Sequence, residues 1–161
     1  MKKIFSIFLC LVILISTLVF DVIASDKEEI EPILLSFSLT EEAKMSYYSN
    51  ERASGLITTY GLSLEKTGTV LKIYGLTQGS PVVEKCGFKN LVIQRRASSS
   101  DSWKDYYDYG DVYVDGYAAN LSTTLSVVSG YQYRISCKHY AKKNIFSVET
   151  IANTSGIVTV S

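Results

Sequence analysis

The sequence predicts an antiparallel β-sandwich of two sheets, with seven or eight strands. From about residue 52 onward, short runs rich in β-branched and aromatic residues alternate with turn residues. No long helical pattern separates these runs, which argues against the alternating strands and helices of a parallel sheet. Roughly 110 residues are enough for two packed sheets around one core.

Each expected strand is bounded by turn residues. The first run is 56–64, where Gly61 predicts a bulge or kink. The later runs are 69–74, 91–96, 103–109, 112–114, 123–128, 131–140 and 146–160. Side-chain alternation along these runs predicts which residues lie between the sheets: Leu71, Ile73, Trp103, Val112, Val114, Leu125, Tyr131, Tyr133 and Ile135.

Residues 1–24 resemble a signal peptide. Lys2 and Lys3 precede the apolar run 4–20, and compact residues at 22–24 suit a signal peptidase. We therefore expect a secreted, extracellular chain that begins at Ser25 and has no stable membrane span. The alternative is a retained anchor, because the run is only slightly shorter than the ~20 residues that a span requires.

Residues 25–51 are rich in acidic side chains and lack strand alternation. We expect them to form a mobile acidic linker, with at most a short helix capped at Ser38 and extending to Met45. The sandwich domain is then predicted to occupy residues 52–161.

Leu125 and Tyr131, followed by strict alternation through Ile135, resemble one corner of fibronectin type III-like and immunoglobulin-like domains. In those domains the leucine closes the core and the tyrosine anchors the corner between two strands. Val127 stands where the family has a proline. The resemblance implies a sandwich of that type.

A second resemblance spans about residues 52–161. It rests on residues 52–54, Gly87, 93–95, Trp103, 130–134 and 140–141, whose order is similar to that in a family of small secreted proteins from Gram-positive anaerobes. It implies export from a Gram-positive bacterium and a β-sandwich. It supplies neither a catalytic residue nor a ligand.

Cys86 and Cys137 are the only cysteines that remain after removal of residues 1–24. Export places them where thiols oxidise. In an immunoglobulin-type sandwich the third and sixth core strands run antiparallel side by side, which brings the start of one near the end of the other. We therefore predict a disulfide between Cys86 and Cys137.

The sequence contains little material for catalysis. Its single histidine, His139, lies two residues from Cys137, a spacing open to a Cys-His dyad or half a metal site. Asp105, Asp108, Asp111 and Asp115 cluster without the dense spacing of a calcium loop. We expect structural and solvated roles for these groups, with no catalytic residue, cofactor or metal. The 16 basic and 16 acidic residues cancel, and we expect no nucleic-acid partner.

Two surface patterns are candidates for binding. Alternation from an inward Trp103 turns Tyr106 outward, and inward Val112 and Val114 turn Tyr113 outward, near Tyr117. Exposed tyrosines stack on sugars or anchor protein partners, although tyrosine also suits half-buried strands.

The second pattern is basic. Arg134 and Lys138 face away from Tyr133, and Lys142 and Lys143 follow. Arg95 or Arg96 would join them if the third strand is adjacent. This face suits an anionic surface such as a cell-wall polymer; the alternative role is solubility and protection of a sheet edge.

The leading hypothesis is a non-catalytic extracellular module that binds a glycan, a cell-envelope polymer or another protein. One alternative is a small secreted hydrolase that uses an aspartate pair such as Asp108 and Asp111. Another is a secreted signal, toxin or immunity factor.

Overall fold

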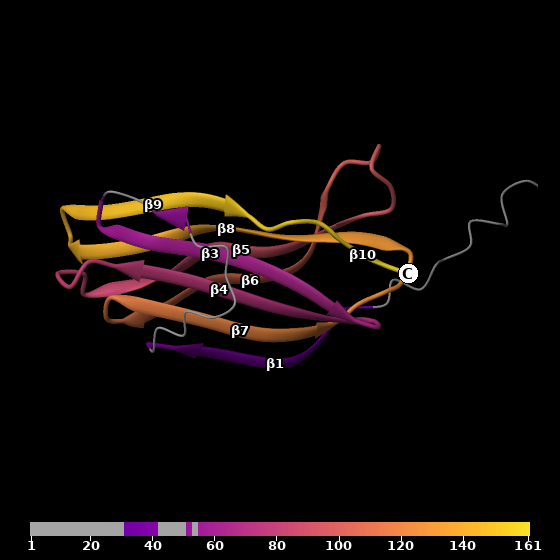
Figure 1. Cartoon of the computed structure of the whole chain (residues 1–161), viewed down its shortest axis with the longest axis horizontal. Coiled ribbons are helices and arrows are strands. Elements are labelled where there is room, and N and C mark those ends of the chain that lie inside the picture. The colour runs from indigo at the N-terminus through magenta and orange to yellow at the C-terminus, as the bar shows by residue number, and fades with distance from the viewer. Residues whose placement is uncertain (1–30, 42–50, 53–54) are drawn as a thin grey trace, which may run out of the picture. The chain divides into compact units, whose positions relative to one another are not determined.

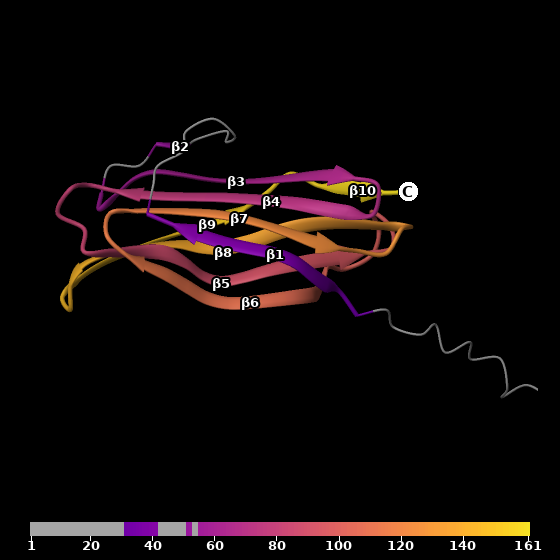
Figure 2. The same ribbon diagram turned by 90° about the horizontal axis from the view of Figure 1, so that it is seen from below.

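Two antiparallel sheets pack face to face in the computed structural model (Figures 1 and 2), which describes residues 31–41, 51–52 and 55–161. The first sheet, called here the β4 sheet, runs in the order β1 (Ile33–Thr40), β7 (Ala118–Ser126), β4 (Val70–Gly79), β3 (Ile57–Thr67) and the two-residue β2 (Glu51–Arg52). The predicted all-β, two-sheet sandwich is confirmed.

The second sheet, called here the β8 sheet, is centred on its longest strand. Its order is β10 (Val158–Val160), β8 (Tyr131–Asn144), β5 (Lys85–Arg96) and β6 (Lys104–Asp115), and β9 (Ser147–Thr154) also pairs with β8. Register places β10 against residues 131–133 and β9 against residues 136–144 of β8. The two short strands therefore pair with successive stretches of one long strand.

The core lies between the sheets, where alternate residues of each strand meet. Leu71, Ile73, Leu125, Tyr133 and Ile135 are buried, as alternation predicts. Val112, Val114 and Tyr131 also pack against the same cluster, as predicted, but they are only partly buried.

The predicted burial of Trp103 is wrong. Its ring lies just before β6 and carries the guanidinium groups of Arg96 and Arg134, each 4.4 Å from the ring. The register supplies the reason: Ile93 pairs with Tyr107 but Gln94 pairs with Asp105, so a bulge interrupts the alternation at this end of β6.

The same bulge reverses the prediction for Tyr106. Tyr106 is the residue left over between the two pairs, and it packs inward, with its ring 5.5 Å from that of Tyr133. Without this bulge, side-chain alternation counted from an inward Trp103 would place Tyr106 on the solvent side.

Part of the predicted acidic linker is a strand instead. Residues 33–40 form β1, which pairs with β7 from Ile33↔Ser126 to Thr40↔Asn120. Leu39 packs on the core and the ring of Phe37 lies 5.7 Å from that of Tyr109. Pairing with β7 therefore outweighs the helix-capping pattern expected at Ser38, and the compact unit begins at Pro32 rather than residue 52. The predicted signal peptide, 1–24, and the rest of the linker at 25–30 and 42–50 lie outside the described residues.

The corner tyrosine is Tyr133, not Tyr131. The Tyr133 hydroxyl donates to the Val128 carbonyl at 2.7 Å and accepts from the Val128 amide at 3.1 Å. Tyr131 instead lies 4.9 Å from the guanidinium of Arg95.

The predicted disulfide is absent, because Cys86 and Cys137 are both free and buried. Their strands do adjoin, but Cys86 pairs with Ala141, four residues beyond Cys137. That offset is ~13 Å along a strand, against the ~4.4–6.8 Å between Cα atoms that a bridge requires. The one irregularity in this pairing lies between Lys89 and Val92, where Asn90 has a φ of 48°.

Burial makes both thiols unreactive. It raises the pKa of Cys86 to about 12, with a smaller contribution from Glu41, and the pKa of Cys137 to about 12. Since the thiolate is the reactive form, both sulfurs should react only slowly with an oxidant or electrophile at neutral pH while the chain is folded.

We predict that a chain beginning at Ser25 retains two free thiols after purification without reductant. Iodoacetamide should label them slowly in the native state, because both are buried and protonated, and rapidly in denaturant. Mass spectrometry checks this. A mass lower by two hydrogens and no labelling after unfolding would restore the disulfide.

Candidate functional site

The outer face of the β8 sheet carries a row of cationic side chains. In β5 and β8 the residues between the core positions face outward, and the register aligns them across the two strands. The positive members define what we call the basic face: Lys85, Lys89, Arg96, Arg134, Lys138 and Lys142.

Two cross-strand pairs on the basic face join like charges. Lys85 pairs with Lys142, and Lys89 pairs with Lys138. Like charges directly opposite one another destabilise a sheet, so this arrangement opposes folding. Lys85 has an acidic partner in Asp115 at 3.3 Å, and the ammonium of Lys89 lies 5.9 Å from the Tyr140 ring.

At the other end of this face, the guanidinium groups of Arg96 and Arg134 each lie 4.4 Å from the Trp103 ring. Gln94 accepts from Arg134 Nε and Gln132 accepts from Arg96 Nε, each at 2.8 Å. These bonds fix the two guanidinium groups, whose remaining N–H groups are suited to bind an anion.

The pKa of Arg134 is lowered, first by burial and second by the nearby charge of Arg96. Bringing a negative group close would relieve both effects, because it compensates the lost hydration and the repulsion.

The strands beside the basic face differ in charge. Outward positions of β9 are uncharged (Val148, Thr150, Ala152 and Thr154). On the opposite side, β6 contributes Asp105, which accepts from Gln94, and Asp111 and Asp115. The positive stripe therefore lies between a neutral strand and an acidic strand.

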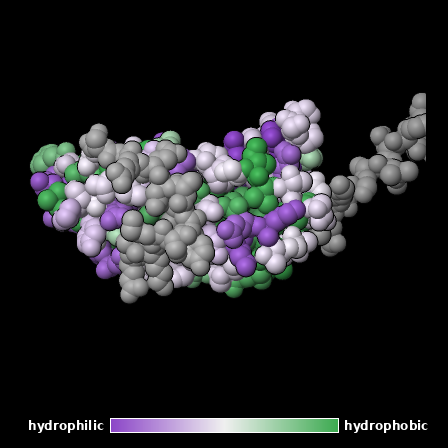
Figure 3. Space-filling view, viewed as in Figure 1, coloured by the Kyte–Doolittle hydropathy of each residue, from purple (hydrophilic) through white to green (hydrophobic). Residues whose placement is uncertain are grey.

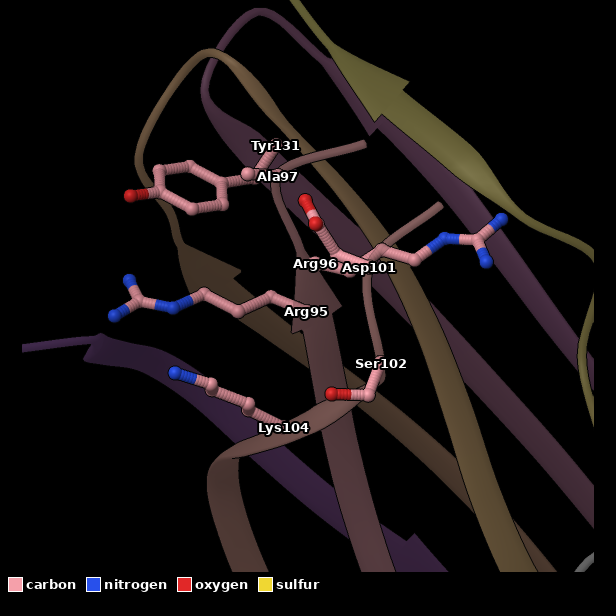
Figure 4. Close-up of a pocket in the computed structure, with 7 residues that line it drawn as sticks. All are labelled: Arg95, Arg96, Ala97, Asp101, Ser102, Lys104 and Tyr131. Atoms are coloured by element: carbon pink, nitrogen blue, oxygen red, sulfur yellow. The ribbon is translucent and has the colours of Figure 1, made fainter. Parts of the chain in front are cut away.

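A pocket of about 330 Å³ opens beside the Trp103 end. Figure 4 shows Arg95, Lys104 and Tyr131 extending toward one side of it and Arg96 toward the other. The Arg95 guanidinium lies 4.4 Å from the Tyr106 ring and 4.9 Å from the Tyr131 ring. The lining residues are Arg95, Arg96, Ala97, Asp101, Ser102, Lys104 and Tyr131.

The one carboxylate of the pocket is already engaged. Asp101 accepts from the amide and the hydroxyl of Ser98 at 2.8 and 2.9 Å. Three cations against one bound carboxylate make the pocket suitable for a small anionic group.

The structure separates the predicted binding residues. Arg134 and Lys138 lie on the basic face with Arg96, while Arg95 points into the end of the sandwich beside Tyr106. Tyr113 faces outward as predicted, 4.9 Å from Tyr140, and Tyr117 is exposed. Sequence reasoning missed Trp103 and the glutamines that bond Arg96 and Arg134, although a tryptophan directly after a serine-rich turn was a usable signal.

The predicted aspartate cluster is spread along β6. Asp108 accepts from the Gly110 amide at 2.7 Å, and Asp111 accepts from the Asn90 amide and the Tyr113 hydroxyl, each at 2.8 Å. These bonds lower the pKa of Asp111, with Asn90 the largest cause. A glycosidase acid requires the opposite shift. Among the described residues, no group of three or more His, Cys, Asp and Glu side chains is arranged to hold a metal ion.

His139 is fully buried in a chain of hydrogen bonds that crosses both sheets. Asn153 Oδ1 accepts from the Thr154 amide, which directs Asn153 Nδ2 to His139 Nε2 at 3.3 Å. His139 Nδ1 then donates to Thr77 Oγ1 at 2.8 Å, and that hydroxyl donates to the Gly87 carbonyl at 2.9 Å. Both ring nitrogens are therefore engaged, and neither is left for a dyad with Cys137.

Burial lowers the pKa of His139 to about 3. The ring is neutral when folded, whereas in the unfolded chain it takes up a proton below about pH 6.5. The stability that a neutral His139 permits is thus complete above about pH 6.5 and is lost as the pH falls toward 3, by at most ~1.4 kcal/mol per pH unit.

We predict that His139→Gln flattens this dependence. Replacement removes the titrating group, so the free energy of unfolding should fall less steeply between about pH 6.5 and about pH 4.5 than in the unaltered chain. Urea unfolding at several pH values measures both slopes. Parallel curves would show that His139 is charged in the folded state.

The chain matches no family model, no curated protein and no solved structure. The part of the chain that the structure describes also contains no helix long and apolar enough to cross a membrane. The function must therefore be inferred from the site.

Proposed function

We propose that this protein is a secreted, non-catalytic β-sandwich module that binds an anionic cell-envelope polymer through its basic face. The like-charge pairs Lys85↔Lys142 and Lys89↔Lys138 carry the proposal. They cost stability in the free protein, and a polyanion laid across β5 and β8 would offset that cost.

A repeating ligand suits the spacing of these charges. Arg134, Lys138 and Lys142 lie at every fourth position of β8, on the outward side. In a strand this spacing is ~13 Å, so the row extends over ~26 Å. A polymer with regularly spaced phosphate or carboxylate groups presents charge over such a distance, whereas a single small anion meets only one cation or two.

Tyr113 and Tyr140 make a sugar-containing polymer the preferred class. Their rings lie 4.9 Å apart on the outer face of the β8 sheet, beside the ammonium of Lys89. Aromatic faces stack on sugar rings while the neighbouring guanidinium and ammonium groups bind the anions. The pocket lined by Arg95 and Lys104 would accept one further anionic group at the Arg134 end of the row of cations.

We also infer that the sandwich is of the fibronectin type III-like and immunoglobulin-like kind. The β4 sheet contains β3, β4 and β7 as neighbours, and the β8 sheet contains β6, β5, β8 and β9. These match strands A, B and E, and C′, C, F and G, of that architecture. The hydrogen bonds of Tyr133 to Val128 support the inference.

Export of the module is a prediction that its N-terminal sequence supports. In the native Gram-positive host that the sequence resemblance implies, culture supernatant and cell-wall extracts should contain a chain that begins at Ser25, because a signal peptidase removes residues 1–24. Intact-mass spectrometry checks this. Recovery of full-length protein with the membrane fraction would indicate a retained anchor.

A separate prediction concerns the basic face. Replacing Arg134 and Lys138 together by Gln should weaken binding to a purified phosphate-bearing wall polymer about tenfold or more, because two charge-assisted contacts are lost. Binding should also weaken as salt concentration rises. Calorimetric titration measures both effects.

Lys72→Gln is the matched control, since Lys72 faces outward from β4 on the other sheet. It should leave the affinity unchanged, and a neutral polysaccharide of similar length should bind neither protein. An equal loss of affinity from Lys72→Gln would show that only the net charge of the protein matters, and would contradict binding through the basic face.

A further inference from the structure

The turn between β8 and β9 carries apolar side chains that the rest of the fold leaves uncovered. Ile145 and Phe146 form this turn and are 75% and 93% exposed, and Val148 follows at 49%. Figure 1 places this turn at the left end of the sandwich, and Figure 3 shows hydrophobic and hydrophilic surface side by side at that end. We call Ile145, Phe146 and Val148 the hairpin tip.

Folding does not explain this composition. Tight hairpin turns favour Asn, Asp and Gly. Here the polar requirement of the turn is met from outside it, because Asn144 Oδ1 accepts from the Phe146 amide at 2.9 Å. The two side chains that project from the turn are therefore free of any role in closing it.

Two neighbouring turns present further exposed groups at the same end. Val82 precedes β5 and Tyr117 lies between β6 and β7, and each is about half exposed. Backbone bonds join these turns to β8: the Glu84 amide donates to the Lys142 carbonyl at 2.9 Å, and the Gly116 amide donates to the Glu84 carbonyl at 2.7 Å. The tip therefore projects from a braced end of the sandwich.

Cations stand directly behind the apolar residues. Lys142 and Lys143 end the β8 side of the hairpin, and as consecutive strand residues they point to opposite faces. The acidic side chains of this end lie beside other partners: Glu41 and Glu84 are next to Gly116, and Asp115 is 3.3 Å from the Lys85 ammonium. Glu149 belongs to the hairpin, but its carboxylate accepts from the Ile57 amide at 2.8 Å. Apolar residues at a tip with lysines behind them match the layering of a bilayer surface, where phosphates lie outside the hydrocarbon.

We propose that this end of the sandwich docks on an anionic lipid bilayer. Phe146 and Ile145 enter the boundary between headgroups and acyl chains, and Lys142 and Lys143 contact lipid phosphates. This site adjoins the basic face and shares Lys142 with it, while the other cations of that face lie along the flat side of the β8 sheet. A module held in this way at the membrane presents that face to polymers of the surrounding envelope.

The first test places a fluorescent reporter at the tip. Phe146→Trp is made in a Trp103→Phe background, in a chain beginning at Ser25, because residues 4–20 are apolar enough to insert by themselves. The strands that the structure describes lie within 33–160 around their own core. Vesicles of phosphatidylcholine with phosphatidylglycerol should shift its emission to shorter wavelength, and brominated lipids should quench it.

Ile157→Trp in the same background is the matched control, because Ile157 is also about half exposed but lies between β9 and β10. Its emission should not change. An unchanged spectrum at residue 146, or equal changes at residues 146 and 157, would overturn the proposal.

The second test uses vesicle sedimentation. Phe146→Ser should reduce partitioning about tenfold or more, since a phenylalanine side chain loses its burial in lipid. Lys143→Gln should weaken binding only when phosphatidylglycerol is present. Lys66→Gln is the control and should not weaken binding, because Lys66 lies in β3, where its ammonium donates to the Thr159 carbonyl. The exposed position of Phe146 predicts an unaltered melting temperature. If a folded Phe146→Ser protein bound vesicles as strongly as the unaltered chain, another surface would be responsible and the proposal that the hairpin tip enters the bilayer would be wrong.

Discussion

The antiparallel pairing of β5 with β8 is the interaction on which the rest of the structure depends. Its register, with one bulge at Asn90, decides which residues of both strands face the core. The same register holds Cys86 four positions away from Cys137 and brings Arg96 and Arg134 to the ring of one tryptophan. One set of backbone hydrogen bonds thus keeps the two buried cysteines too far apart for a disulfide and also sets the charge pattern of the surface.

A buried polar chain adds a directional link between the sheets. Thr77 belongs to the β4 sheet, whereas Gly87, His139 and Asn153 belong to the β8 sheet. Apolar packing alone tolerates small sliding movements, but each donor in this chain meets one acceptor, so displacement would leave a buried polar group unpaired. Gly87 is also required sterically, because a Cβ there would collide with the Val112 carbonyl.

Sequence reasoning succeeded where strand alternation was uninterrupted, and failed where a distant partner or a bulge decided the outcome. Leu71, Ile73 and Ile135 were predicted correctly because their strands are regular. Trp103 and Tyr106 were assigned to the wrong faces because the extra residue in β6 is visible only in the register. β1 was missed because the partner that stabilises it, β7, lies far along the chain. For the candidate site, Arg134 and Lys138 were anticipated, while the contribution of Trp103 was not.

The position of β1 also affects how the molecule is made. Synthesis produces this strand early, yet the strand with which it pairs is completed only when Ser126 has been added. At the usual rate of elongation the delay is roughly five to twenty seconds. Until then β1 is an apolar segment with unpaired amides and carbonyls, the kind of surface that chaperones bind and that seeds aggregation. This edge of the β4 sheet therefore cannot form in a growing chain before Ser126 has been added, and β1 benefits from protection during that interval.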